Sequence, residues 1–293
     1  MSKQKDPLYI QPTSDIGFHW IFCTEGNEEV VLQLLNILID DKEIVSFTRL
    51  DPVHTVNADT SFRFDLYCKC SDGSRIIVEC QNRSKRDRFM NRALAYSSMA
   101  ITDMLKPNLK YDYSKVYFIG LLNYNQFFGR EQAITKVRLY TEGDYVLAND
   151  NYLQIFVELL KLPKETGDDF PTLFLKAMRD LGRNESRDVK YTDERLGALL
   201  KAASYPSLSE EKQKEYKNYM TTEQDTLEYV EEQISDARIE GFTAGKEEGR
   251  EEGRAEGRED SKLEIAKAMK TEGIPASVIV KCTGLPEEQV KAL

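Results

Sequence analysis

The sequence predicts an α/β protein in which helices flank one mixed sheet, followed by an α-helical C-terminal extension. Up to residue 165, segments rich in β-branched and aromatic residues alternate with segments whose apolar residues recur at helical spacing. An order of helices, strands, one helix and more strands is typical of a mixed sheet. From 169 to 238 the helical spacing continues, so we expect a helical region there.

Two short helices are predicted at the N-terminal end. Thr13 or Ser14, after Pro12, can cap a helix over 15–22, because a hydroxyl accepts a hydrogen bond from a free backbone N–H. Asn27 can cap a second helix in the same way. The apolar residues of this second helix recur at helical spacing, at Val30, Val31, Leu34, Leu35 and Leu38. Both helices are expected to pack on the sheet.

The strands and a long helix follow. Residues 44–50 are predicted to form a strand that ends at Asp51-Pro52. A loop to residue 60 then leads into a hairpin over 61–81. A helix is predicted over 85–106, which contain neither Gly nor Pro, and it ends at Pro107. Later strands are predicted at 116–123, 136–143 and 152–160.

The hairpin carries two carboxylates. Glu79 and Gln81 share one face of their strand, because successive side chains of a strand alternate between faces. Asp65 lies opposite Glu79 only if the loop holds an odd number of residues. Gly73 fits the left-handed position of a three-residue loop over 71–73. This register brings the two carboxylates to Cβ positions about 5 Å apart. They then repel each other unless a cation lies between them, and oxygen ligands favour Mg²⁺ or Mn²⁺.

The charge of the chain limits how it can meet a polyanion. Forty Lys and Arg against fifty Asp and Glu give a net charge of −10, so any contact with nucleic acid must be local. A local surplus of positive charge exists over residues 75–92, beginning at the acidic hairpin. A solvated helix face would show the same charges. The side chains expected to hold phosphates are Arg83, Lys85, Arg88 and Arg92.

Cysteine usage and hydropathy predict a cytoplasmic protein. The five cysteines are an odd number without a CxxC pair, which indicates reduced thiols. Cys68 and Cys70 are expected to pack as small apolar residues rather than to bind zinc. The sequence has no charged leader before an apolar run and no apolar window near 20 residues, so neither secretion nor membrane insertion is expected.

Glycines recur at every fourth residue from 241 to 257, with charged residues between them. Each Gly costs a helix about 1 kcal/mol relative to Ala, which favours a partly helical spacer over a stable helix. A close contact between the C-terminal helices of two copies, giving a homo-oligomer, is the alternative.

The last segment, 261–293, is predicted to form three short helices like a helix-turn-helix module. Its final helix holds Glu287 and Glu288 against Lys291, a poor complement to phosphates, so a small packing module is the alternative to a DNA reader. The predicted organisation is therefore a sheet domain over 1–165, a helical region over 166–240, a spacer over 241–260 and a helical tail over 261–293.

Three segments carry a resemblance to a known family. They are PTSDIGFHWIF (12–22), FDLYCKCSDGSRIIVECQN (64–82) and RALAYSSM (92–99). An Asp, a hairpin and then Glu-x-Gln resemble the PD-(D/E)XK nuclease superfamily with Gln in place of the usual Lys. Together the segments resemble its recombination-promoting nuclease branch, also called PD-(D/E)XK family transposases. The resemblance covers roughly residues 10–160, with a weaker echo in the tail.

The resemblance implies a restriction-endonuclease-like fold and a role for each site residue. Asp65 and Glu79 would bind Mg²⁺ or Mn²⁺, with the backbone carbonyl of Cys80 as a third ligand. Gln81 would orient the attacking water, although it lacks the charge of the usual Lys. Asp15 would assist as an outer-shell ligand or at a second metal. Its alternative role is to stabilise the start of a helix through the helix dipole.

Three other polar side chains are given structural roles. His19 and His54 are isolated in the sequence and are expected to be structural or surface residues rather than general bases. Tyr96 occupies a position that the family also keeps aromatic. We expect it to pack in the core with its hydroxyl near the site.

The most specific hypothesis is that the protein is a metal-dependent DNA endonuclease, which hydrolyses phosphodiester bonds. The family resemblance links such an enzyme to recombination, mobile elements or phage defence. A second reading is an interaction or inhibitory protein that keeps the nuclease scaffold with weak or no activity, as Gln81 and the net charge suggest. A third is a DNA-binding regulator that acts through residues 261–293.

Overall fold

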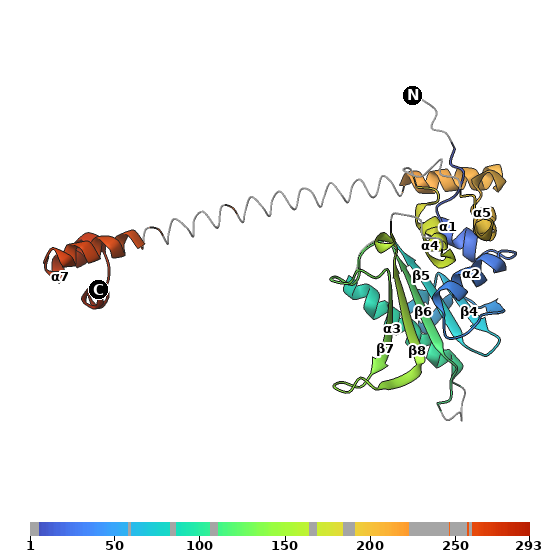
Figure 1. Cartoon of the computed structure of the whole chain (residues 1–293), viewed down its shortest axis with the longest axis horizontal. Coiled ribbons are helices and arrows are strands. Elements are labelled where there is room, and N and C mark those ends of the chain that lie inside the picture. Colours follow the sequence, from blue (N-terminus) through green and yellow to red (C-terminus); the bar gives the residue numbers. More distant parts are fainter. Residues whose placement is uncertain are drawn as a thin grey trace. The chain divides into compact units, whose positions relative to one another are not determined.

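The computed structural model describes residues 6–57, 60–82, 86–105, 111–163, 169–183, 191–222 and 260–293, together with 246 and 257. The chain divides into two compact units, Met1–Tyr219 and Met220–Leu293, and each is described by itself (Figure 1). Among the described residues, no helix has both the length and the apolar character that a membrane span requires.

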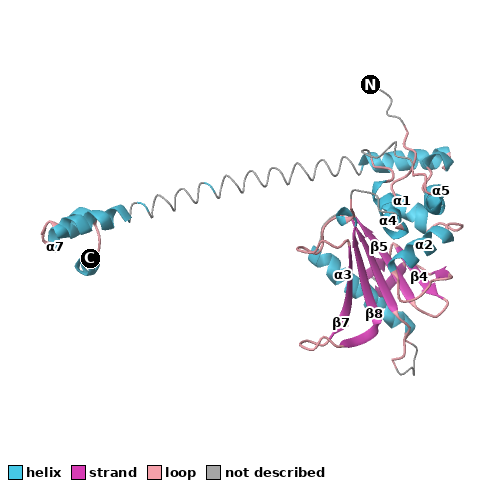
Figure 2. Ribbon diagram, in the orientation of Figure 1, coloured by secondary structure: helices cyan, strands magenta, loops and turns pink. Residues whose placement is uncertain are grey.

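The first unit contains the predicted mixed sheet flanked by helices (Figure 2). Its six strands lie in the order β1-β4-β5-β6-β8-β7. β5, β6 and β8 are parallel to one another, whereas β1, β4 and β7 pair antiparallel with their neighbours. The bounds are β1 Phe47–Arg49, β4 Leu66–Cys70, β5 Arg75–Gln81, β6 Val116–Leu122, β7 Ile134–Tyr140 and β8 Leu147–Glu158.

The predicted hairpin register is confirmed. β4 pairs with β5 so that Leu66 lies opposite Val78 and Lys69 opposite Arg75. The N–H of Cys70 donates to the carbonyl of Ser74 at 3.0 Å, which leaves a loop of three residues, 71–73. Gly73 has φ +87°, a left-handed conformation that favours glycine. By continuation of this register, Asp65 lies opposite Glu79.

Two local predictions in this region were wrong. The expected loop to residue 60 contains a strand, β2 (Val53–Asn57), which forms a separate two-stranded sheet with β3 (Thr60–Arg63). The segment VHTV has the β-branched alternation of a strand, and this outweighed the proline and asparagine around it. The strand expected from residue 44 begins at Phe47, because the Asn36 side chain takes both backbone groups of Ile44, at 2.7 and 2.9 Å.

The N-terminal helices form as predicted. α1 (Asp15–Phe22) is capped by Ser14, whose Oγ accepts from the N–H of Gly17 at 3.1 Å. α2 (Glu28–Leu38) begins after Asn27, but that side chain instead donates to the last carbonyls of α1. A Cβ at position 17 would lie 1.9 Å from the carbonyl oxygen of Gln11, so only glycine fits this close turn. These contacts fix the start of α1 and therefore the place of Asp15.

The long helix α3 (Arg86–Met104) packs on the opposite face of the sheet from α1 (Figure 1). Phe89 of α3 meets Phe118 of β6 and Phe156 of β8, with ring centroids 6.0 and 6.2 Å apart. A Cβ at Gly120 would lie 3.1 Å from the Phe89 and Phe156 rings, so the helix sits close over the sheet at this point. This packing holds the polar side of α3 beside the end of β5.

The helices that follow the sheet also belong to the first unit. They are α4 (Phe170–Asp180), α5 (Gly197–Ala202) and, up to Tyr219, a helix over 210–222. The last of these packs on the N-terminal segment, because the Tyr216 hydroxyl accepts from the N–H of Gln11 at 2.8 Å and its ring lies 6.3 Å from that of Trp20.

The C-terminal unit contains the three short predicted helices, over 260–271, Ala276–Thr283 (α7) and Glu287–Ala292 (α8). Its small core consists of Ala266, Ile279, Leu285 and Val290. Gly284 ends α7 with φ +71°. Most of the predicted spacer, 241–260, lies outside the described residues, and the predicted domain boundaries stay predictions.

Candidate metal centre

Asp65 and Glu79 lie side by side where the hairpin meets α3. The N–H of Asp65 donates to Oε1 of Glu79 at 3.0 Å. In return, Oδ2 of Asp65 accepts from the N–H of Cys80 at 2.8 Å. Each carboxylate is thus held by the backbone next to the other, as expected for residues at one cross-strand position. The structure brings together the two acids that the sequence placed at the centre of the site.

Burial disfavours the ionised form of both acids. Glu79 is 1% exposed, and burial, reinforced by the charge of Asp65, raises its pKa to about 8. Burial also raises the pKa of Asp65 to about 6, against the N–H of Cys80, which lowers it. The charge of Asp15 adds to the rise at Asp65. The pair therefore favours a bound proton or a cation.

Arg92 of α3 provides a positive charge at this point. Its Nη1 lies 3.3 Å from Oε2 of Glu79, and about a third of its side chain is exposed. The guanidinium carbon lies 5.8 Å from the centre of the Phe89 ring. The sequence predicted Arg92 as a phosphate ligand, whereas in this structure it faces the buried carboxylate.

The next two residues of β5 continue the site. Nε2 of Gln81 donates to the carbonyl of Cys80 at 3.0 Å, the oxygen predicted as the third metal ligand. This arrangement leaves Oε1 as the Gln81 atom that can accept a hydrogen bond from water. The Cys80 side chain points to the other face, where its Sγ lies 3.4 Å from the carbonyl oxygen of Thr13. Cys80 therefore offers its backbone rather than its sulfur to the site.

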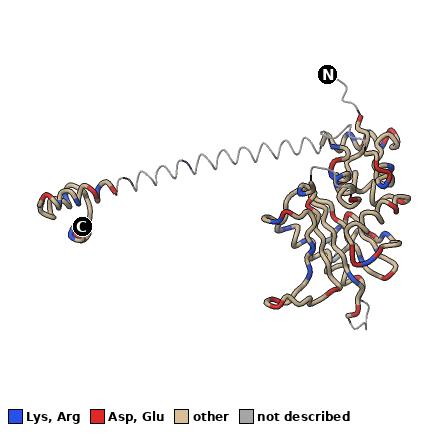
Figure 3. Tube along the Cα trace, viewed as in Figure 1, with Lys and Arg blue, Asp and Glu red and all other residues tan. Residues whose placement is uncertain are grey.

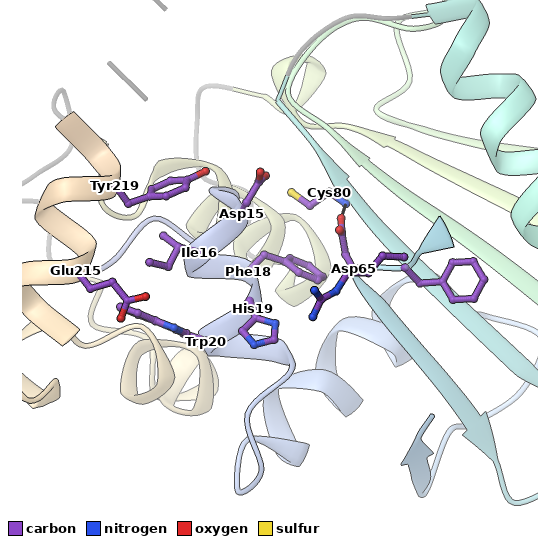
Figure 4. A pocket seen from close by; sticks show the side chains of 11 residues that line it. Asp15, Ile16, Phe18, His19, Trp20, Asp65, Cys80, Glu215 and Tyr219 are labelled. Atoms are coloured by element: carbon purple, nitrogen blue, oxygen red, sulfur yellow. Dashed lines mark hydrogen bonds between the residues drawn. The ribbon is translucent and has the colours of Figure 1, made fainter. Parts of the chain in front are cut away.

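A cavity of about 360 Å³ opens beside Asp65 (Figure 4). Asp15, His19 and Trp20 of α1 line one side of it, and Glu215 and Tyr219 of the helix over 210–222 lie nearby. Asp65 and Cys80 line the opposite wall. Glu79 is absent from the lining and is almost fully buried. The cavity thus reaches the acidic pair through Asp65, with Asp15 across from it.

The oxygen atoms present fit a hard divalent cation. A carboxylate oxygen that accepts one hydrogen bond retains a second lone pair, so both acids can still bind a metal. The described residues contain no cluster of three His, Cys, Asp or Glu side chains placed to hold a metal ion. A cation here would be held by Asp65, Glu79 and the Cys80 carbonyl, with water or phosphate completing the shell. Few protein ligands and several waters are typical of Mg²⁺ sites.

The other residues that the sequence singled out are Arg88, Arg83, Lys85 and Tyr96. Arg88 is exposed on α3, one turn before Arg92. Arg83 and Lys85 lie outside the described residues. The Tyr96 side chain is buried with its hydroxyl donating to the carbonyl of Arg63 at 3.3 Å.

Sequence reasoning missed two features around the site. Arg63 lines the cavity, and its charge lowers the pKa of Asp65. Its position two residues before Asp65 was a usable signal, because alternate residues of an extended chain share a face. The second feature is a polar chain in which Arg183 donates to Asn123 at 2.8 Å and Asn123 donates to Asn82. It depends on the pairing of β5 with β6 and has no local sequence signal.

The charges of the first unit are mixed around this site. Lys and Arg alternate with Asp and Glu along the chain trace, without a broad basic face in the view of Figure 3. The cations whose charges act on Asp65 are Arg92 and Arg63.

A family model, PD-(D/E)XK nuclease family transposase, matches residues 12–233. The chain belongs to this family. No curated protein and no solved structure matches it. Membership of the PD-(D/E)XK family indicates a nuclease-like function and a DNA substrate, and PD-(D/E)XK nucleases generally use divalent metals. The match includes both carboxylates of the hairpin and extends through α4 and α5.

The raised pKa values predict how the metal-free PD-(D/E)XK fold responds to pH. The folded-state pKa values, about 6 for Asp65 and about 8 for Glu79, exceed the value of about 4 in an unfolded chain. The folded state then binds more protons, so stability falls as pH rises through this window. We expect the metal-free protein to lose on the order of 5 kcal/mol between pH 5 and pH 8.

Urea unfolding of the chelator-treated protein at several pH values measures this loss. Asp65→Asn should flatten the dependence, whereas Asp150→Asn, a change at an exposed carboxylate, should leave it unchanged. Stability that stayed level or increased from pH 5 to pH 8 would contradict the electrostatic description of the pair.

Proposed function

We propose that this protein is a metal-dependent DNA endonuclease whose site is formed by Asp65, Glu79 and the carbonyl of Cys80. The observation that supports this best is the reciprocal pair of carboxylates, Glu79 buried and Asp65 half-buried, each bonded to the backbone beside the other. Such a pair is costly to keep ionised without a cation. In a member of a nuclease family, this cost supports a metal site over a structural contact.

The residues around the pair have distinct proposed roles. When bound, Mg²⁺ or Mn²⁺ would lower the pKa of a coordinated water and stabilise the charge of the phosphate. Gln81 would accept a hydrogen bond from that water through Oε1 and so orient it. Asp15 would hold water from across the cavity, and Arg88 would contact the DNA backbone. Arg83 and Lys85 would contact further phosphates of the same DNA strand.

Cleavage of supercoiled plasmid by the purified protein tests this function. Nicked or linear products should form with Mg²⁺ or Mn²⁺ and should be absent in the presence of a chelator. Products that form equally in both conditions would rule out a metal-dependent enzyme.

The proposed enzyme would act in the cytosol, in recombination, mobile-element or phage-defence processes. Copies of the chain would associate through the C-terminal helices.

Gln81 gives a prediction of its own. An amide can hold a water but brings no positive charge to the transition state. We expect Gln81→Lys to keep metal-dependent nicking and to raise its rate, and Gln81→Leu to lower the rate by about 10- to 100-fold, as loss of an orienting partner does. Initial nicking rates at saturating Mg²⁺ measure both changes. A Leu variant as active as the wild type would show that residue 81 does not position water.

The second candidate function is that of an interaction or inhibitory protein that keeps the nuclease scaffold with weak or no activity, and one observation supports it. Arg92 already supplies a cation to Glu79, which is what a nuclease scaffold that binds partners without cutting would need. The plasmid test separates the two functions. A regulator acting through the tail is less supported, because Lys291 of α8 pairs with Glu287 at 2.7 Å and is not directed to a phosphate.

A further inference from the structure

We propose that Arg92 is an internal competitor of the divalent cation. It occupies Glu79 while the site holds no metal and transfers to a substrate phosphate when the cation binds. This inference rests on the proposed function, because it assumes that Asp65 and Glu79 bind a metal. It adds a regulatory role for a residue that the sequence assigned to DNA contact alone.

The first step of the argument is that Arg92 and a metal need the same atom. Oε1 of Glu79 accepts from the N–H of Asp65, directly beyond the paired residues of β4 and β5. Oε2 is the oxygen that Arg92 approaches at 3.3 Å. A cation placed between the two carboxylates would take Oε2. Metal and guanidinium would then stand a few ångströms apart and repel each other.

The second step is that Arg92 is only partly enclosed, although its guanidinium also interacts with the buried Tyr96 hydroxyl. It makes a single contact of 3.3 Å with Glu79 rather than a two-pronged pair, and 34% of its side chain is exposed. Its guanidinium lies near the ring of Phe89, which is buried and fixed against the sheet. When the charged end turns to solvent it leaves Glu79 and the ring together, while the Phe89 ring itself stays fixed in the core.

The third step is that the released group suits the substrate. A guanidinium binds a phosphate through two parallel hydrogen bonds, and α3 holds Arg92 directly beside the acidic pair. In the metal-free protein, the same group offsets part of the repulsion between Asp65 and Glu79. Arg92 would thus contribute to DNA affinity only after the cation has displaced it.

Calorimetric titration of Mn²⁺ into the full-length, chelator-treated protein without DNA tests the competition. We expect Arg92→Gln to bind Mn²⁺ about tenfold more tightly than the wild type, because a positive charge beside the ligand is removed. Arg92→Lys keeps the charge and should remain near the wild type. Arg88→Gln, one turn away on the same helix, is the matched control and should leave Mn²⁺ affinity unchanged.

Binding of a short DNA duplex at several salt concentrations tests the transfer. With Ca²⁺ present, Arg92→Gln should flatten the slope of log K against log salt by about one unit, and in chelator it should leave the slope unchanged. Arg88→Gln should flatten the slope in both conditions. Thermal unfolding of each variant confirms that it is folded.

The outcomes separate this inference from the proposed function. If the wild type binds Mn²⁺ and Arg92→Gln binds it with the same or a weaker affinity, the competition is overturned, while the proposed metal site is not. Failure of both wild type and Arg92→Gln to bind Mn²⁺ overturns the proposed metal site and this inference with it. If Arg92→Gln changes the slope of log K against log salt equally with and without Ca²⁺, the transfer of Arg92 to the phosphate is overturned.

Discussion

Asp65→Asn is expected to abolish Mg²⁺-dependent nicking of plasmid DNA while the protein remains folded. Loss of one ligand removes several kcal/mol of charge stabilisation from the transition state, which corresponds to about a thousandfold or more in rate. Glu79→Ala should have the same effect on activity. Nicking rates with saturating Mg²⁺, compared with chelator-treated wild type, measure the loss.

The fold should survive Asp65→Asn because the new side chain can still accept a hydrogen bond. Its amide oxygen takes the place of Oδ2 and accepts from the N–H of Cys80, and the backbone N–H at position 65 still donates to Glu79. Without metal, this variant should be more stable than the wild type near pH 8, since carboxylate repulsion is relieved. Undiminished nicking by Asp65→Asn, with Asp150→Asn as the active control, would remove Asp65 from the site.

Glu158→Ala is expected to destabilise the first unit by about 3–5 kcal/mol, the usual cost of removing one partner of a buried ion pair. Glu158 is fully buried at the end of β8. Its Oε1 accepts from the N–H groups of Gln126 and Phe127 at 2.7 and 3.0 Å. Its Oε2 accepts from Lys161 at 2.8 Å, and Lys161 also donates to the carbonyl of Phe127. One carboxylate thus satisfies three donors.

Urea unfolding compares this variant with Glu158→Gln. The amide oxygen of Gln can keep both backbone N–H partners, so only the contact with Lys161 is weakened and the loss should be clearly smaller. An Ala variant within about 1 kcal/mol of the wild type would show that water replaces the carboxylate at little cost.

The hairpin shows how much of the site the sequence could predict. Side-chain alternation placed Glu79 and Gln81 on one face, and Gly73 indicated the loop length that sets Asp65 opposite Glu79. Both rules act over a few residues. They therefore needed no knowledge of the rest of the fold.

Features that depend on distant contacts were not predicted. The contact of Arg92 with Glu79 requires the distance between α3 and β5, which Gly120 and the aromatic core set. The hydrogen bonds that shorten the first strand come from Asn36 in another helix. The polar chain from Arg183 to Asn82 joins residues about a hundred positions apart. Local patterns contain none of this information.

The three-residue loop over 71–73 restricts how this protein can change by insertion and deletion. Residues that face each other across the hairpin point to the same side of the sheet. Losing or gaining one loop residue would turn Asp65 to the face of Val78 and away from Glu79, whereas a change of two residues would preserve the pairing. Hairpins of this kind can therefore vary in length during evolution only in even steps, if both acids are to stay together.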